Sequence, residues 1–154
     1  VSHDEGAVVV ALLLGKLDEA AERDVRLDLD VAEPTPALPL APAEAVTIVG
    51  NLVDKALDAA SSGAEPRWVR VVVREGGGDV VLEVSDSGAG FDPALEDPFA
   101  FGASTKPAHA PGGRGVGLAL VRDIVAAHGG TLQVVADPTT VRVFLPAVAE
   151  AVVS

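Results

Sequence analysis

Hydrophobic residues recur three and four positions apart in three segments of the chain, which is the spacing of one face of an α-helix. These segments cover residues 5–23, 43–61 and 115–128. Pro42 suits the first turn of the second helix, and Gly63 suits the position just after it. The apolar side of this second helix is expected to contain Val46, Val49, Leu52, Val53, Ala56, Leu57 and Ala60.

Shorter segments alternate between apolar and polar residues, which is the period of a half-buried β-strand. The alternation predicts strands at residues 25–30, 68–74, 80–85, 131–135 and 140–145. A glycine-rich turn joins the second and third of these strands, as in a β-hairpin. The order of the elements predicts an α+β fold, a two-layer sandwich in which helices cover one face of a mostly antiparallel sheet.

One long segment, between residues 86 and 113, has little periodicity of either kind. A loop of this length inside a compact domain is uncommon unless it has a function. We therefore expect a lid over a ligand site, lying between the helices and the sheet.

Composition excludes several classes of function. Lys and Arg total 11 against 23 Asp and Glu, and the net charge of -12 disfavours nucleic acid and anionic membrane surfaces as partners. The absence of cysteine excludes disulfides and thiolate metal sites. The longest apolar run, residues 7–14, is far shorter than the ~20 residues of a membrane span. This segment is therefore not expected to lie in the membrane.

The second predicted helix carries a polar stripe opposite its apolar side. Asn51, Asp54, Lys55 and Asp58 are three or four residues apart and share one face. A carboxamide oxygen such as that of Asn51 is a ligand that Mg²⁺ accepts. A solvated helix face would show the same pattern, so both interpretations stay open on these residues alone.

A second motif follows a predicted strand. Asp86 is succeeded by Gly88, Gly90 and Phe91 in the run DSGAGF. A buried carboxylate can accept the exocyclic amine of adenine, and the glycines allow backbone to approach a flat ligand closely. An ordinary strand-to-turn junction is the alternative.

A third motif, GRGVGL at residues 113–118, opens the last predicted helix. Free N–H groups, the positive end of the helix dipole and Arg114 converge there, as phosphate binding requires. The run has the spacing of neither the dinucleotide-binding fingerprint nor the P-loop. In the lid, Ser104, Thr105 and Lys106 add two hydroxyls and a cation.

Taken in order, the runs NLVDKALDA, DSGAG, DPFAFGASTK and GRGVGL resemble the N, G1, F and G2 boxes of histidine kinases. The resemblance covers residues 25–146 and extends to the superfamily of gyrase, the ninety-kilodalton heat-shock chaperone and MutL-type mismatch repair proteins, which share the Bergerat fold. Within the kinases, the chain is most similar to the citrate and dicarboxylate sensor branch. The resemblance implies an ATP-binding catalytic domain of a two-component sensor histidine kinase, which transfers the γ-phosphoryl group of Mg·ATP to a histidine on a separate helical domain.

The resemblance also implies roles for individual residues. Asn51 is expected to ligate Mg²⁺, and Asp86 to bind the adenine amine. The expected catalytic groups are Asn51, Lys55, Lys106 and Arg114. The expected nucleotide-binding set is Asn51, Asp86, Gly88, Gly90, Phe91, Ser104, Thr105, Lys106, Gly113, Arg114, Gly115, Val116, Gly117, Leu118 and Thr140. Thr140 is expected to support a water molecule beside Asp86.

Two positions depart from the family pattern. Lys55 replaces an asparagine, and Thr47 stands where ATP-hydrolysing relatives place a glutamate base. Because threonine is no general base at neutral pH, this favours a kinase over an ATPase switch of the same fold. A serine kinase of the anti-sigma-factor type is the second alternative, and Lys55 leaves open a third, a non-catalytic module in which nucleotide is lost or only structural. Lys55 can either reach the phosphates or pair with Asp58.

The expected organisation has three parts. Residues 1–24 continue a dimerisation helix from upstream, residues 25–148 form the ATP-binding domain, and residues 149–154 form a tail. Because too few residues precede the first strand for a helical hairpin, His3 is not expected to be the phosphoacceptor. The expected partners are the dimerisation and histidine-phosphotransfer domain of the same kinase and a downstream response regulator. The resemblance implies the cytoplasmic domain of a membrane-anchored sensor.

Overall fold

The computed structural model describes residues 2–32, 38–88, 114–135 and 138–146 of the chain. Each element begins and ends within three residues of the segment predicted for it. The elements are, in order, α1 (Ser2–Glu22), β1 (Arg26–Val31), α2 (Pro42–Ser61), β2 (Trp68–Gly76), β3 (Asp79–Asp86), α3 (Arg114–Ala127), β4 (Thr131–Val135) and β5 (Thr139–Pro146).

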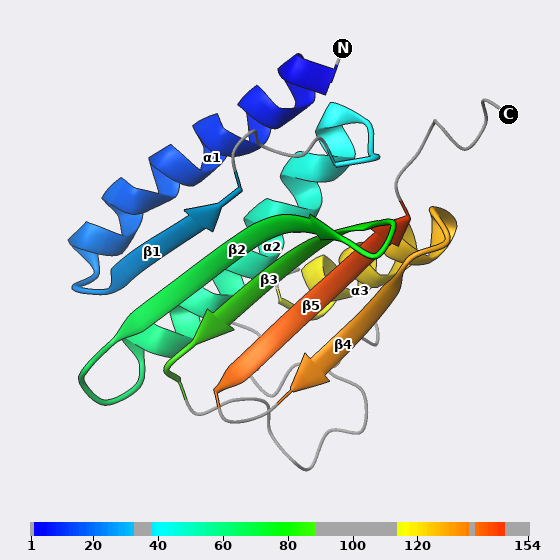
Figure 1. Ribbon diagram of the computed structural model, residues 1–154. Helices are drawn as coiled ribbons and strands as arrows, with labels where there is room; N and C mark the ends of the chain where they lie inside the picture. Colours follow the sequence, from blue (N-terminus) through cyan, green and yellow to red (C-terminus); the bar gives the residue numbers. More distant parts are fainter. Residues whose placement is uncertain (1, 33–37, 89–113, 136–137, 147–154) are drawn as a thin grey trace, which may run out of the picture.

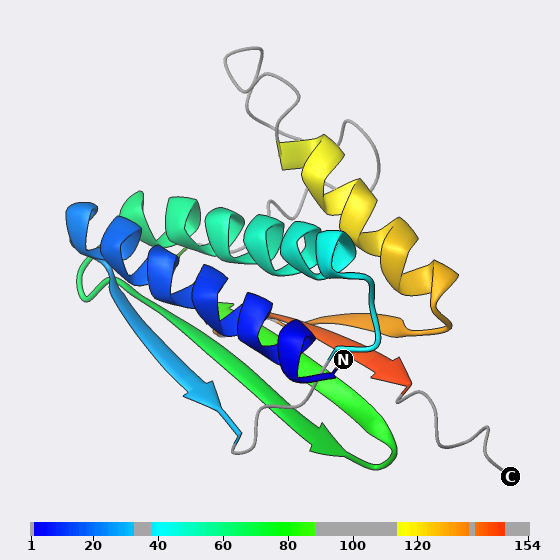
Figure 2. The same ribbon diagram turned by 90° about the horizontal axis from the view of Figure 1, so that it is seen from above.

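The strands form one five-stranded sheet in the order β1-β2-β3-β5-β4. β1 runs parallel to β2, and the other neighbouring strands are antiparallel. The turn between β2 and β3 places Gly77 and Gly78 at φ values of 63° and 85°, which glycine adopts without strain. All three helices lie on the same face of the sheet (Figures 1 and 2). The predicted two-layer α+β sandwich is confirmed.

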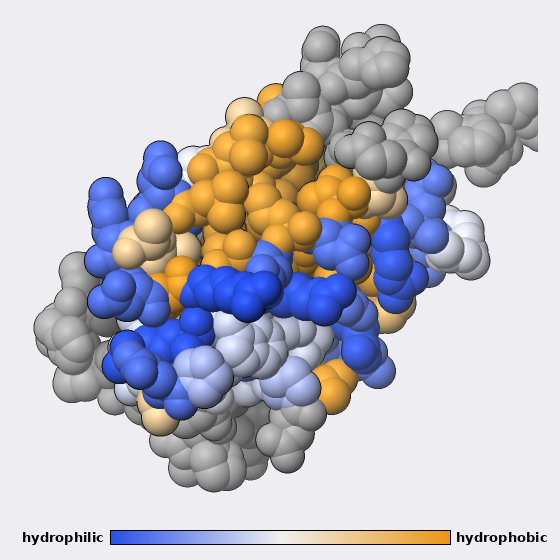
Figure 3. All heavy atoms as spheres, turned by 60° about the vertical axis from the view of Figure 1, so that its left-hand side comes forward, coloured by the Kyte–Doolittle hydropathy of each residue, from blue (hydrophilic) through white to orange (hydrophobic). Residues whose placement is uncertain are grey.

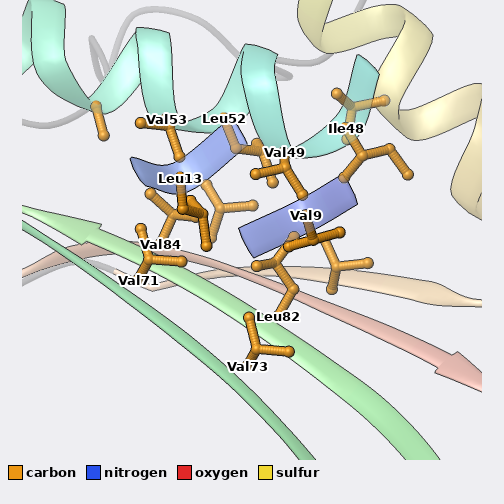
Figure 4. Close-up of a cluster of buried hydrophobic side chains, with 14 of the residues drawn as sticks. Val9, Leu13, Ile48, Val49, Leu52, Val53, Val71, Val73, Leu82 and Val84 are labelled. Atoms are coloured by element: carbon orange, nitrogen blue, oxygen red, sulfur yellow. The ribbon is translucent and has the colours of Figure 1, made fainter. Parts of the chain in front are cut away.

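The core fills the space between the sheet and the helices, and α2 lies at its centre (Figure 4). Its fully buried side chains include Val49, Leu52 and Val53, as the apolar stripe predicts. The prediction that Val46 belongs to this stripe is wrong, because its side chain is 41% exposed. Ala45 and Ile48 point into the core in its place.

Helix α1 packs into the same core and is tied to α2 by charged side chains. Its residues Val9, Leu13 and Ala20 are buried. Lys16 Nζ lies 2.7 Å from Asp54 Oδ1 of α2. A second link joins the turn after α1 to α2, since Arg23 Nη2 donates to Asp58 Oδ1 at 2.6 Å and to Ser61 Oγ at 2.9 Å.

Apolar side chains also gather on one side of the molecule, above a band of hydrophilic residues (Figure 3). Leu14 of α1, 54% exposed, is the most exposed large apolar residue in the described part of the chain. No helix among the described residues is long and apolar enough to cross a membrane.

Candidate nucleotide site

The polar stripe of α2 divides into two halves with different surroundings. Asp54 binds Lys16 of α1 and Asp58 binds Arg23, directly after α1, as described above. Asn51 and Lys55 lie on the part of the stripe that continues, one turn later, to Ala59, because residues four apart share a helix face. Ala59 is the point at which α2 meets the segment after β3. The second half of the stripe therefore lines the C-terminal end of β3.

Asn51 is half-buried on α2 and is oriented by its own helix. Its Nδ2 donates to the carbonyl oxygen of Thr47 at 2.7 Å. Because the carboxamide is planar, this bond directs Oδ1 away from that carbonyl. An amide oxygen held in this way is suited to a hard cation such as Mg²⁺.

Asp86 is the last residue of β3 and is only 3% exposed. It shares the helix-facing side of the sheet with Leu82 and Val84, since strand residues two apart point to the same face. Its Oδ1 accepts a hydrogen bond from the Gly88 amide at 2.8 Å. Burial raises the pKa of Asp86, while the Gly88 hydrogen bond and the positive charge of Lys55 act in the opposite direction.

The turn after β3 is pressed against α2 at Gly88. A Cβ atom on Gly88 would lie 2.5 Å from the carbonyl oxygen of Ala59, a distance that no side chain tolerates. Ser87, next to it, anchors the turn to β2, because its Oγ accepts from the Trp68 amide at 2.9 Å. Glycine at position 88 thus allows the turn that follows Asp86 to pack directly against α2.

Two alternatives for Lys55 followed from the sequence, a contact with the phosphates or a pair with Asp58. The charge of Lys55 acts on the Asp86 carboxylate at the end of β3. Asp58 Oδ1 binds Arg23 at 2.6 Å. The charge effect relates Lys55 to the end of β3, and the two alternatives stay predictions.

The structure does not bring Thr140 to Asp86. In the register of β3 and β5, Asp86 lies opposite Thr139, and Thr140 lies opposite Ser85. Thr140 Oγ1 is 3.0 Å from Ser85 Oγ and donates to the Pro138 carbonyl at 2.9 Å. The core residues Val141, Val143 and Leu145 alternate along β5, so Thr139 shares their face and Thr140 points to the other side of the sheet. Thr139 is the residue that can assist Asp86.

The other expected site residues divide by what the structure describes. Leu118 is buried in the core, where it packs α3 against the other elements. The first turn of α3 contains four of them, of which the structure describes the backbone: Arg114, Gly115, Val116 and Gly117. Outside the described residues lie Gly90, Phe91, Ser104, Thr105, Lys106 and Gly113.

Sequence reasoning missed two residues of the site. Thr139 could have been found from the alternation of Val141, Val143 and Leu145, which places it in phase with the core. Ala59 had no signal of its own, because a small residue on a helix is common, and only the approach of Gly88 gives it a role.

Comparison with known proteins identifies the family of the chain. The family description "Histidine kinase-, DNA gyrase B-, and HSP90-like ATPase" matches residues 41–149. The sensor protein CitS of Bacillus subtilis (strain 168) is 36% identical over 139 residues, which is 88% of this chain and 25% of that protein. The sensor histidine kinase DpiB of Escherichia coli (strain K12) is 36% identical over 128 residues, or 80% of this chain and 23% of that protein. The chain thus spans about a quarter of the length of these relatives.

Solved structures show the same fold at lower sequence identity. The catalytic domain of the histidine kinase ThkA superposes with a TM-score of 0.74 at 16% identity, covering 91% of this chain and 90% of that one. The mycobacterial sensor histidine kinase MprB gives 0.68 at 24% identity, with 91% and 92% covered. With its five-stranded sheet, its glycine-bounded carboxylate at the end of β3 and its family match, the chain belongs to the family of histidine kinase-, DNA gyrase B- and HSP90-like ATPases.

Proposed function

We propose that this chain is the catalytic domain of a sensor histidine kinase, which binds Mg·ATP and transfers its γ-phosphoryl group to a histidine on a separate helical domain. The observation that carries the proposal is Asp86, a buried carboxylate at the end of β3, on the helix-facing side of the sheet. A buried carboxylate needs donors. The amine of adenine supplies one, and the family match names ATPases.

The residues around Asp86 fit a flat base. Gly88 packs its backbone against Ala59 of α2, which fixes the turn that follows Asp86. Thr139, in register with Asp86 on the same face, places a hydroxyl that can hold the base or a water molecule beside the carboxylate. These two residues would define the adenine end of the site.

The other end of the site would hold the phosphates. Asn51 offers a carboxamide oxygen to Mg²⁺, and the start of α3 at Arg114 offers the positive end of a helix dipole to phosphate oxygens. Mg²⁺, when bound, would neutralise charge on the phosphoryl group in transfer. We assign Lys106, Ser104 and Thr105 to the same task from the sequence resemblance alone.

Thr47 and Glu44 precede Asn51 on α2, and their contacts bear on the choice between a kinase and an ATPase switch. Thr47 Oγ1 donates to the Ala43 carbonyl at 3.0 Å, and a threonine is no base for activating water. Glu44 accepts from the Ala41 amide at 3.0 Å and lies 2.9 Å from His128 Nε2, so it caps α2 and binds α3. Both contacts favour phosphoryl transfer to an external nucleophile, and an acceptor imidazole is itself a nucleophile.

The partners follow from this role. The acceptor would lie on the dimerisation and phosphotransfer domain of the same protein, with α1 continuing its upstream helix, and a response regulator would receive the phosphoryl group next. CitS and DpiB are named as sensors. By analogy, we place this chain on the cytoplasmic side of a membrane-anchored sensor.

Calorimetric titration with Mg·ATP tests the proposal. The unmodified chain should bind, and Asp86→Asn should weaken binding about tenfold or more, because a carboxamide can turn an N–H toward the adenine amine. Asp30→Asn, at an exposed carboxylate of β1 paired with Arg70, is the matched control and should bind normally. No binding by the unmodified chain, or equal binding by all three proteins, contradicts the adenine assignment.

A second assay identifies the acceptor. Incubation with radiolabelled ATP and an added helical hairpin from a sensor kinase should give acid-labile phosphate on the hairpin. Acid-stable phosphoserine on a protein substrate would instead support the serine-kinase alternative, and ATP hydrolysis without any transfer would support an ATPase switch.

A further inference from the structure

We propose that Lys55 is a second base-recognition residue, which donates a hydrogen bond to a ring nitrogen of adenine while Asp86 accepts from the neighbouring amine. This inference rests on the proposed function, since it concerns the same site. It assigns Lys55 to the adenine end of the site rather than to the phosphates.

The position of Lys55 follows from the spacing along α2. Asn51, Lys55 and Ala59 are four residues apart and lie in one row on the helix surface. The last of them touches the turn after β3, where a Cβ on Gly88 would come within 2.8 Å of the Ala59 side chain. One turn earlier in the same row, Lys55 is therefore level with the end of β3.

The environment of Asp86 is the second observation. Asp86 is 3% exposed, and its Oδ1 accepts a 2.8 Å hydrogen bond from the Gly88 amide. Lys55 supplies the positive charge that acts on this carboxylate and opposes the rise of its pKa on burial. The row on α2 and the charge acting on Asp86 both put the Lys55 ammonium on the side of α2 that meets the end of β3.

Such a pair presents a donor next to an acceptor. An ionised carboxylate only accepts hydrogen bonds, and an ammonium only donates them. Adenine has the complementary edge, because its amine is flanked by two ring nitrogens that accept. Guanine carries an oxygen in place of the amine, and in the same pose that oxygen would face the Asp86 carboxylate. The pair therefore selects purines that carry an amine at this position.

The test compares ATP with its 1-deaza and 7-deaza analogues, each of which lacks one flanking ring nitrogen. Calorimetry on the unmodified chain should show one analogue binding about tenfold more weakly than ATP, because a hydrogen bond from a charged donor is lost. In Lys55→Met, which keeps an apolar stem of similar length, that analogue and ATP should bind equally. Lys55→Arg should restore part of the difference, since it keeps a donor and the charge.

The alternative is that Lys55 only neutralises Asp86 and never touches the base. Lys55→Met would then change the affinity of ATP and of both analogues by the same factor, and the inference would be wrong while the proposed function stood. A chain that binds no nucleotide at all would overturn both.

A measurement without nucleotide tests the pair itself. Carbon-13 NMR of the Asp86 carboxyl should show a higher pKa in Lys55→Met than in the unmodified chain, because the opposing charge is gone. Arg74→Met is the control, since this residue lies on the outer face of the sheet near Glu83. An unchanged pKa in Lys55→Met would show that Lys55 does not lie at Asp86 and would overturn the inference.

Discussion

The two halves of the polar stripe on α2 contain similar residues but have different roles. On one half, Asp54 meets Lys16 of α1 at 2.7 Å, and Asp58 meets Arg23, directly after α1, at 2.6 Å. On the other half, the charge of Lys55 acts on Asp86, the buried carboxylate at the end of β3, and Asn51 lies one turn earlier on α2. The first half holds α1 and the turn after it against α2, and the second half carries the proposed nucleotide ligands.

The difference lies in which partner is buried. In the α1–α2 half, the lysine is buried and the carboxylate half-exposed, with side-chain exposures of 11% for Lys16 and 55% for Asp54. Burial opposes ionisation of Lys16, but hydrogen bonds and charge from Asp54 and Glu19 raise its pKa. In the β3 half the carboxylate is the buried group and its pKa rises. A carboxylate kept from water without full compensation is suited to a ligand that brings a donor.

The largest expected effect separates the two halves directly. Asn51→Ala should reduce the affinity for Mg·ATP by about a hundredfold or more, because a Mg²⁺ ligand is lost, and should leave the free energy of unfolding nearly unchanged. Calorimetry with Mg²⁺ and with a chelator measures the first quantity, and urea denaturation measures the second.

Asp54→Ala, three residues further on, should have the opposite pattern of effects on stability and ATP affinity. It should lower the free energy of unfolding by about 1–3 kcal/mol, since Lys16 loses its 2.7 Å partner, and should bind ATP normally. If both variants lose ATP affinity to the same extent, the division of the stripe is wrong.

The second largest effect on ATP binding and stability is expected at Gly88. Gly88→Ala should destabilise the chain by about 1–3 kcal/mol and weaken ATP binding, because the new methyl group meets the backbone of Ala59. Gly50→Ala is matched in chemistry and lies in α2 with open space around it. It should stabilise the chain by about 0.5–1 kcal/mol. Thermal unfolding and calorimetry of both variants give the comparison, and native affinity in Gly88→Ala would refute the close approach.

The third effect is a pH dependence of opposite sign for binding and stability. Because the pKa of Asp86 is raised in the folded chain, its contribution to stability is full below the ordinary value of 3.8 and declines as the pH rises through the folded value. ATP affinity should move the other way and fall on acidification, since protonation removes an acceptor. Both should be measured as the difference between the unmodified chain and Asp86→Asn. A difference that does not vary with pH would contradict the raised pKa.

The smallest effect distinguishes two neighbouring threonines. Thr139→Val should weaken ATP binding a few-fold, because its hydroxyl lies on the face of Asp86. Thr140→Val should leave affinity unchanged and cost about 1 kcal/mol of stability, since its hydroxyl bonds to Ser85 and to the Pro138 carbonyl. The reverse outcome in calorimetry would restore Thr140 as the site residue.

Local pattern was enough for the elements. The helical and alternating periods predicted all eight elements to within three residues, because burying one face of each element requires that pattern. The order of the four motifs also pointed to Asn51, Asp86 and Gly88, and the structure joins Asp86 and Gly88 by a hydrogen bond at the end of β3. Their roles in nucleotide binding stay predictions.

Other features depend on which elements meet in space. The stripe on α2 gives no sign of which half α1 covers, because Asp54 and Lys55 are adjacent in sequence and a helix turns them only about 100° apart. Packing decided it, by placing Lys16 of α1 against Asp54 and Arg23, directly after α1, against Asp58.

The register of β5 was decided in the same way. A shift of one residue moves a side chain to the other face of a sheet, and pairing with β3 put Thr139 rather than Thr140 beside Asp86. The sequence by itself determined which segments are helices and strands and which residues are candidates for chemistry. Tertiary structure alone decided which of those residues face one another, because that depends on contacts between elements far apart in the chain.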